Sequence, residues 1–219
     1  MDTFNTVCHT KVKLGGQYLD FCHVRDGQKY VCMDELMDDM RAGKCLVYSF
    51  GLAQDWTFEE TVASMGCKVF AFDPTVDPPA QTSPNITFKK LGVVGESTGN
   101  KDYKTLQELL KENGHQTTKI SYLKMDVEGS EMGGLPLWLN SGALDYVEQL
   151  ALEIHISSSN EVNSTKDFFQ TFKNLQLVGN FRIFNWDPNK CWKNQGNYNF
   201  FHLFEVAFRK INPSTSCSK

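Results

Sequence analysis

The feature that most constrains the fold is a regular alternation of strand-like and helix-like segments after residue 44. Apolar runs of strand length cover residues 45–50, 68–72, 86–91, 120–125 and 149–156. Helical patterns lie between most of these runs, for example over residues 103–113, after residue 130 and over about 162–173. Alternation of this kind predicts a parallel sheet with helices on both faces. We therefore predict an α/β fold with a Rossmann-like, doubly wound, mostly parallel sheet.

The two ends of the chain depart from this alternation. Residues 177–186 and 198–208 are strand-like and separated only by a loop, so they predict a C-terminal antiparallel hairpin at one edge of the sheet. Residues 72–86 contain four prolines, so that crossover is predicted to be a loop. Residues 1–44 are predicted to form an irregular N-terminal cap segment with one short helix near 34–41, ahead of the domain over residues 45–219.

Charge and hydropathy argue against several classes of function. The formal net charge of −4 argues against a wide basic face for nucleic acid. The longest apolar runs have strand length, so no transmembrane span is predicted.

The chain has seven cysteines and no C-x-x-C pair, which argues against a structural zinc site. Four of them crowd the N-terminal segment: Cys8, Cys22, Cys32 and Cys45. We predict that at least one disulfide ties this segment, with Cys191 as one candidate partner; scattered unpaired thiols are the alternative. Glycosylation sequons begin at Asn85 and Asn163. Together these features favour the lumen of the secretory pathway (Golgi) or the extracellular space, and leave the cytoplasm open.

Candidate ligand-binding residues lie where the predicted strands end, because ligands bind at the carboxyl ends of such strands. These residues are Ser49, Phe50, Gly51, Asp55, Asp73, Asp126, Glu153 and His155. The first loop lacks the glycine patterns that cradle phosphates. Its single Gly51 and small residues instead suit a nucleoside that carries a cationic amino-acid tail.

Two of these acids have a specific predicted role and a plainer alternative. Asp73 lies 22 residues after Gly51, where an acid can accept hydrogen bonds from both ribose hydroxyls. The alternative is that Asp73 and Pro74 simply open a turn. Asp55 could face an ammonium group or cap the following helix.

Four stretches in this order carry a family resemblance: VYSFGLAQDWTFE, VFAFDPT, LKMDVEGSE and ALEIH. Together they resemble the FkbM-related methyltransferases, and within them the animal methyltransferase-like proteins, over roughly residues 31–156. The resemblance implies a class I fold, S-adenosylmethionine as methyl donor, and a hydroxyl acceptor on a sugar or small molecule. It matches Gly51 to the donor-loop glycine and Asp73 to the ribose acid. It also matches further acids, namely Asp126, Glu128, Glu131 and the fifth-strand Glu153.

Methylation of a hydroxyl requires a group that takes its proton. We predict His155 as this general base, with Asp126 orienting it and Glu153 as a further catalytic residue. The alternatives are that Asp126 is the base, or that His155 only forms hydrogen bonds at the sheet edge. A divalent cation held by Asp126, Glu153 and His155 is an alternative that the spacing does not distinguish, and we favour the version without metal. Glu131 is predicted to cap a helix rather than to act in catalysis.

The predicted function is an S-adenosylmethionine-dependent O-methyltransferase that acts on a glycan or other polyhydroxylated acceptor. Two alternatives remain at this level. One is a methyltransferase of a small non-sugar metabolite, and the other is an inactive binding protein on a methyltransferase scaffold.

Overall fold

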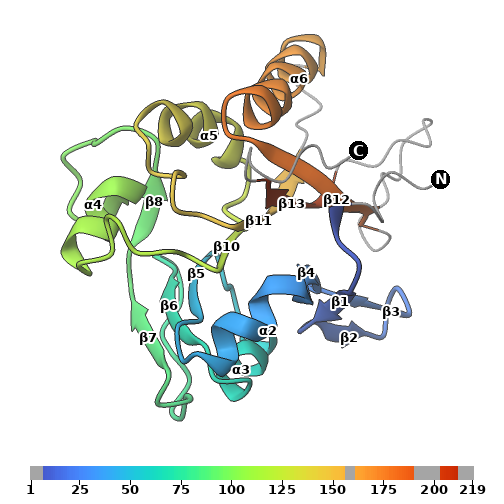
Figure 1. The fold of residues 1–219 in the computed structure, drawn as a ribbon, viewed down its shortest axis with the longest axis vertical. Coiled ribbons are helices and arrows are strands. Elements are labelled where there is room, and N and C mark those ends of the chain that lie inside the picture. The colour runs from blue at the N-terminus through green and yellow to red at the C-terminus, as the bar shows by residue number, and fades with distance from the viewer. Residues whose placement is uncertain (1–6, 156–160, 190–202, 212–219) are drawn as a thin grey trace, which may run out of the picture.

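The computed structural model describes residues 7–155, 161–189 and 203–211. Seven strands form the central sheet, namely β5 (Leu46–Phe50), β6 (Lys68–Phe72), β7 (Ile86–Lys89), β10 (Tyr122–Met125), β11 (Gln149–His155), β12 (Phe181–Pro188) and β13 (Leu203–Lys210). Their order across the sheet is β12-β13-β11-β10-β5-β6-β7, and the five strands from β11 to β7 are parallel (Figure 1). The predicted α/β, Rossmann-like, mostly parallel fold is confirmed.

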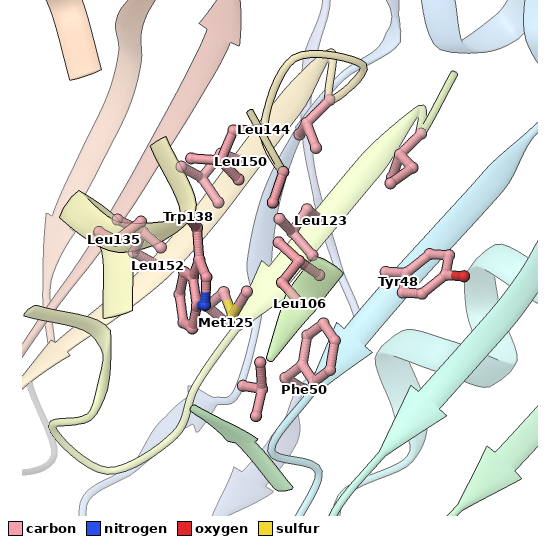
Figure 2. Close-up of a cluster of buried hydrophobic side chains, with 14 of the residues drawn as sticks. Tyr48, Phe50, Leu106, Leu123, Met125, Leu135, Trp138, Leu144, Leu150 and Leu152 are labelled. Atoms are coloured by element: carbon pink, nitrogen blue, oxygen red, sulfur yellow. The ribbon is translucent and has the colours of Figure 1, made fainter. Parts of the chain in front are cut away.

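Helices cover both faces of this sheet (Figure 1). On one face lie α2 (Met33–Arg41) and α3 (Thr57–Ser64), and on the other lie α4 (Leu106–Glu112), α5 (Glu131–Asn140) and α6 (Glu161–Leu177). The larger of the two cores is on the α4–α6 side, where Trp138 and Leu106 point toward sheet residues such as Met125 (Figure 2). The fully buried Trp138 donates its indole N–H to the carbonyl oxygen of Val94, 2.9 Å away.

Helix α4 illustrates how the local pattern sets an element and its boundaries. Leu106, Leu109 and Leu110 are buried on one face, and Thr105 caps the helix together with Glu108 in a capping box. The predicted helix began too early, because residues 103–105 form strand β9 (Tyr103–Thr105), which pairs with β8 (Gly92–Val94). The proline-rich stretch of residues 73–85 contains no helix, as predicted.

The C-terminal hairpin is antiparallel as predicted, but its place in the sheet differs from the prediction. Strand β13 lies between β11 and β12, antiparallel to both, so the antiparallel strand is not at the edge. Ala207 and Phe208 of β13 are buried as a consequence. Helix α6 extends to Leu177, so β12 starts later than the pattern predicted. Residues 198–202 of the predicted last strand lie outside the described ranges.

The N-terminal segment is more ordered than the sequence predicted. It contains strand β1 (Lys11–Leu14), which pairs antiparallel with β4 (Lys29–Cys32), and strand β2 (Gln17–Leu19), which pairs with β3 (Val24–Asp26). The Gln149 side chain fastens β4 to the sheet, because it exchanges two hydrogen bonds with the backbone of Cys32.

Two disulfides in the described residues confirm that cystines tie this segment. Cys8 is bonded to Cys32, and Cys45 is bonded to Cys67. Cys22 is disulfide-bonded as well. Cys191, the partner considered from the sequence, lies outside the described residues. Among the described helices, none has the length and apolar character that crossing a membrane requires.

Candidate active site

A cleft of about 790 Å³ opens at the carboxyl ends of β5, β6, β10 and β11. Seven of the residues predicted from the sequence line it: Phe50, Gly51, Asp55, Asp73, Asp126, Glu153 and His155. Residues from the N-terminal hairpin, such as Gln17 and Gly27, close its other side. The fold therefore brings the predicted strand-end residues to one place.

Ser49 is the predicted residue that does not line this cleft. Its side chain is fully buried and donates a hydrogen bond to Glu59, 2.5 Å away. Lys124 lies beside the same carboxylate and donates to the carbonyl oxygen of Gly51 at 2.6 Å. Ser49, Glu59 and Lys124 therefore do not line the cleft but stabilise it, because they hold the loop after β5 against the end of β10.

The loop after β5 is held in place by Asp73. One carboxylate oxygen of Asp73 accepts from the backbone amides of Leu52 and Ala53, at 2.8 and 2.9 Å. The other oxygen accepts from the amide and the hydroxyl of Thr75, at 2.7 and 2.6 Å. Burial would raise the pKa of Asp73, but these hydrogen bonds lower it, so the group stays ionised.

The contacts of Asp73 match its turn-forming alternative. Four hydrogen bonds use the lone pairs that a carboxylate offers, so Asp73 organises the loops on both sides of the cleft. Asp55 also plays the plainer of its two predicted roles, since its carboxylate accepts from the amide of Thr57 at the start of α3.

A cluster of three acids and one lysine lies at the inner end of the cleft. The ammonium group of Lys29 donates to Asp126, 3.2 Å away, and to Glu205, and its side chain has no exposed surface. Glu153 shares a hydrogen bond with Asp126 and accepts another from the amide of Asn189 at 3.1 Å. Three carboxyl groups thus surround one ammonium, so one of them is best accommodated in its protonated form.

The pKa values of the three carboxyl groups in this cluster differ from one another. Burial raises the pKa of Glu153 to about 8, helped by the charges of Asp126 and Glu205, although Lys29 opposes it. Burial also raises the pKa of Glu205 to about 7, again against the attraction of Lys29. For Asp126 burial acts in the same direction, but Lys29 and Lys124 outweigh it and lower the pKa. At neutral pH the cleft therefore presents an ionised Asp126 beside a protonated Glu153.

His155 lies between two carboxylates, that of Glu128 in the loop after β10 and that of Glu131 at the start of α5. Its Nε2 is 3.3 Å from Glu128 and its Nδ1 is 3.7 Å from Glu131. Burial would lower the pKa of His155, but Glu131, Glu153 and Glu128 raise it to about 9. The imidazole is therefore protonated at neutral pH, which argues against the predicted role of His155 as the general base.

Glu131, the first residue of α5, holds the loop after β10 with its carboxylate, and α5 has no side-chain cap hydrogen bond, so the predicted capping role is not observed. The Glu131 carboxylate accepts from the amides of Val127 and Gly129, at 2.6 and 2.8 Å, and it is completely buried. Between them, Glu128 adopts a left-handed conformation with φ of 56°, which directs its exposed side chain toward His155.

Asp126, Glu128 and His155 could in principle hold a metal ion, since their ligand atoms lie within 4.8 Å of one another. Lys29 and the protonated imidazole already supply positive charge to these carboxylates. We therefore assign no metal to this cluster.

Lys29 and Tyr103 lie at the site but are not among the residues predicted from the sequence. Lys29 comes from strand β4, where it is buried together with Val31 in the alternating stretch K-Y-V-C. A lysine at a buried position of an alternating strand indicates that an acidic side chain lies opposite it, because a buried charge requires a partner. Tyr103 lines the opposite, more apolar end of the cleft with Pro74 and Val93. It was assigned to a helix, so its place at the cleft was hidden.

Comparisons with known proteins agree with this geometry. A family model described as a methyltransferase domain matches residues 4–202. "Probable methyltransferase-like protein 24" of Homo sapiens is 29% identical over 173 residues, which cover 70% of this chain and 46% of the relative. The protein of the same name from Rattus norvegicus is 30% identical over 173 residues, or 70% and 47% of the two chains. The chain thus spans about half the length of the curated relatives it matches.

Solved structures resemble the chain more distantly. Fibrillarin of Aeropyrum pernix with natively bound S-adenosyl-L-methionine has a TM-score of 0.42 and 10% identity, and covers 76% of this chain and 66% of its own. The 1,6-didemethyltoxoflavin-N1-methyltransferase of Burkholderia thailandensis has a TM-score of 0.41 and 12% identity, and covers 82% of each chain. The family match extends over nine-tenths of the sequence, including most of the N-terminal segment. By that match, the chain belongs to the methyltransferase-domain family.

Proposed function

We propose that this protein is an S-adenosylmethionine-dependent methyltransferase whose acceptor is a hydroxyl of a glycan or another polyhydroxylated molecule. The main observation in support of this methyl donor is the negative charge of the cleft. Six acids line it, namely Asp26, Asp55, Asp73, Asp126, Glu128 and Glu153, and no lysine or arginine does so among the described residues. Such a lining attracts a cationic ligand and repels phosphate groups. S-adenosylmethionine carries a sulfonium and an ammonium, whereas dinucleotides carry a pyrophosphate.

The shape of the cleft fits the same donor. Its volume lies within the range of about 300–1,000 Å³ that is usual for small-molecule and cofactor sites. Pro74, Val93 and Tyr103 form an apolar end suited to an adenine ring, and Asp126 and Glu153 form an acidic end suited to the sulfonium. Gly51 follows β5, which lies between β10 and β6 in the sheet, so Gly51 lies between the two ends. When bound, this donor supplies an electrophilic methyl group.

Glu153 is the residue best placed to take the proton of an acceptor hydroxyl. General bases work best with a pKa near the operating pH, and that of Glu153 is about 8. A cation in the cleft lowers this raised pKa, so the carboxyl releases its proton and becomes the base once a cationic donor has bound. Before that release, the protonated Glu153 donates a hydrogen bond to the ionised Asp126, which orients the Glu153 carboxyl group in the cleft. His155 remains an imidazolium held by Glu128 and Glu131.

The acceptor proposal is supported by a second, polar pocket that shares Asp26 and Gly27 with the cleft. This pocket of about 330 Å³ is lined by basic, acidic and amide groups, including Lys13, Arg25 and Asn189. A mixture of hydrogen-bond donors and acceptors of both charges suits a neutral polyol better than a phosphodiester or an apolar compound. A small non-sugar metabolite with several hydroxyl groups meets the same requirement and is the second candidate.

The proposal also includes the subgroup of methyltransferases to which the protein belongs and the cellular compartment in which it acts. The D-x-E-G-x-E acids support a place among the FkbM-related methyltransferases, since Asp126, Glu128 and Glu131 all lie at or beside the cleft. Disulfides between Cys8 and Cys32 and between Cys45 and Cys67 support an oxidising compartment, the secretory pathway or the extracellular space.

Donor binding and product formation test the function separately. We expect titration calorimetry to detect S-adenosylmethionine binding, and a panel of glycans and small polyols to yield S-adenosylhomocysteine with at least one sugar. Glu153→Gln should lower turnover by about 10²–10⁴-fold, the usual effect of losing a general base. Glu148→Gln, just before the other end of the same strand, is the matched control.

Each proposal has its own contradicting result. Absence of donor binding overturns the methyltransferase proposal. Donor binding with turnover only on non-sugar compounds selects the second candidate. Donor binding without turnover on any acceptor selects the inactive scaffold.

A further inference from the structure

The N-terminal segment supplies the only described cation that contacts Asp126 directly within ion-pair distance. Lys29 lies in β4, 97 residues before Asp126 and 176 before Glu205 in the sequence. Its side chain is completely buried, and its ammonium group donates to both carboxylates. A lysine in such a place costs desolvation energy, which its contacts with Asp126 and Glu205 and the nearby charge of Glu153 offset.

The backbone around Lys29 is fastened on several sides. Strand β4 pairs with β1, Cys32 is bonded to Cys8, and Gln149 of β11 holds the backbone of Cys32. The hydroxyl of Tyr122 donates to the carbonyl oxygen of Tyr30 at 2.7 Å. The ammonium group is therefore held at a fixed place relative to β10 and β11.

We propose that Lys29 is a positioning residue of the transfer site, which fixes the Asp126 carboxylate at the inner end of the cleft, so that the N-terminal segment is part of the catalytic unit. This inference rests on the proposed function for its kinetic consequences. Lys29 does not line the cleft, and it acts on the reacting groups through Asp126 and, across the shared hydrogen bond, through Glu153.

Several charged groups besides Lys29 face Asp126 and influence its pKa. In addition to Lys29 on β4, they are Lys124 on β10, Glu153 and His155 on β11, Glu205 on β13, and Glu128 in the loop after β10. Lys29 is the strongest of the cations that oppose the effect of burial on Asp126. Its removal should therefore make Asp126 harder to ionise.

The test uses the full chain and two variants. Lys29→Met removes the ammonium and leaves two carboxylates buried without it, so it can fail to fold. Lys29→Met combined with Glu205→Gln removes one carboxylate at the same time and keeps the buried charge balanced. Lys11→Met is the control, because Lys11 also joins the N-terminal segment to the sheet, through the carbonyl oxygen of Phe184, but contacts neither acid.

We expect the folded double variant to bind S-adenosylmethionine and to lose turnover by about 10²-fold, the effect of a misplacement of about 1 Å at a reacting centre. The acid limb of its pH–rate profile should lie about 1–3 units higher than that of Glu205→Gln alone, the range for a carboxylate that loses an adjacent cation. Lys11→Met should keep both properties. A uniform loss at every pH, or wild-type turnover, would assign Lys29 a structural role only.

A second readout does not depend on methyl transfer. The carboxyl ¹³C resonance of Asp126, followed by NMR in the donor-free protein, should titrate about 1–3 pH units higher in the double variant than in Glu205→Gln alone, because the two proteins differ only in the Lys29 ammonium. An unchanged midpoint overturns the inference even if the protein is an active methyltransferase. A shifted midpoint in a protein that shows no transfer supports the inference and leaves the failure with the proposed function.

Discussion

A β-carbon on Gly51 would lie 1.6 Å from the backbone carbonyl oxygen of Asp126. The ends of β5 and β10 are held together by the hydrogen bond from the amide of Asp126 to the carbonyl of Phe50, and the amide of Gly51 joins the end of β5 to Phe72 of β6 on its other side. Gly51 also has a φ of +74°, which L-residues with a side chain rarely adopt. The floor of the cleft thus depends on one residue without a side chain.

Replacement of Gly51 by alanine is expected to disrupt this floor. The left-handed backbone alone costs about 1–2 kcal/mol, and the overlap with Asp126 forces the strand ends apart in addition. Gly114→Ala is the matched control, since Gly114 has a φ of +71° but nothing within 4 Å of an added β-carbon. Urea unfolding should show a larger loss for Gly51→Ala than for the control. Equal losses would mean that the strand ends separate without cost.

Replacement of Asp73 by asparagine should loosen the loop after β5. An amide cannot accept from Leu52, Ala53 and Thr75 together, because one of its two ends carries hydrogens. We expect a loss of about 1.5–3 kcal/mol in the free energy of unfolding, the range for a hydrogen bond to a charged group, and weaker donor binding by calorimetry. Asp77→Asn, at an exposed pair with Lys90, should change neither. Unchanged stability and affinity in Asp73→Asn would remove Asp73 from the site.

The raised pKa of His155 predicts a pH dependence of stability. The pKa is about 6.5 in the unfolded chain and about 9 in the folded protein, so the folded state binds more protons between these values. The contribution of His155 is therefore complete below pH 6.5 and lost as the pH rises through 9. The difference in unfolding free energy between wild type and His155→Gln should shrink over that range.

His115 provides a control of opposite sign. Burial and the charges of Lys68 and Lys89 lower its pKa, so its neutral form is favoured in the folded protein. The corresponding difference for His115→Gln should grow, not shrink, as the pH rises toward neutrality. If both histidine variants show the same trend, the electrostatic assignment of His155 is wrong.

The two described disulfides should each contribute to stability. They close loops between residues 24 and 22 positions apart, for which chain entropy gives a contribution of about 3 kcal/mol each. The double variants Cys8→Ala/Cys32→Ala and Cys45→Ala/Cys67→Ala should therefore lower the melting temperature in scanning calorimetry. Alkylation of the unreduced wild type followed by peptide mass analysis should leave these four cysteines unlabelled. Labelling of any of the four would contradict the assigned pairs.

The sequence alone determined the fold class and the edge at which the site lies. Strand-length apolar runs separated by helical patterns require a parallel α/β sheet, because each element carries its own burial pattern. Gly51, Asp73, Asp126 and Glu153 each lie at or near the end of a strand, and parallel strands bring their carboxyl ends to one edge. These properties follow from local order along the chain, so they could be predicted.

The tertiary structure alone decided which side chains meet there and which protons they hold. The insertion of β13 beside β11 brings Glu205 to the site, and strand β4 of the N-terminal segment brings Lys29. Lys29 lies 97 residues before Asp126 and 176 before Glu205. No local pattern encodes such contacts. The ionised Asp126, the protonated Glu153 and the imidazolium of His155 depend in turn on burial and on those distant charges. Proton positions are a property of the assembled cluster, so the sequence could name the acids but not their roles.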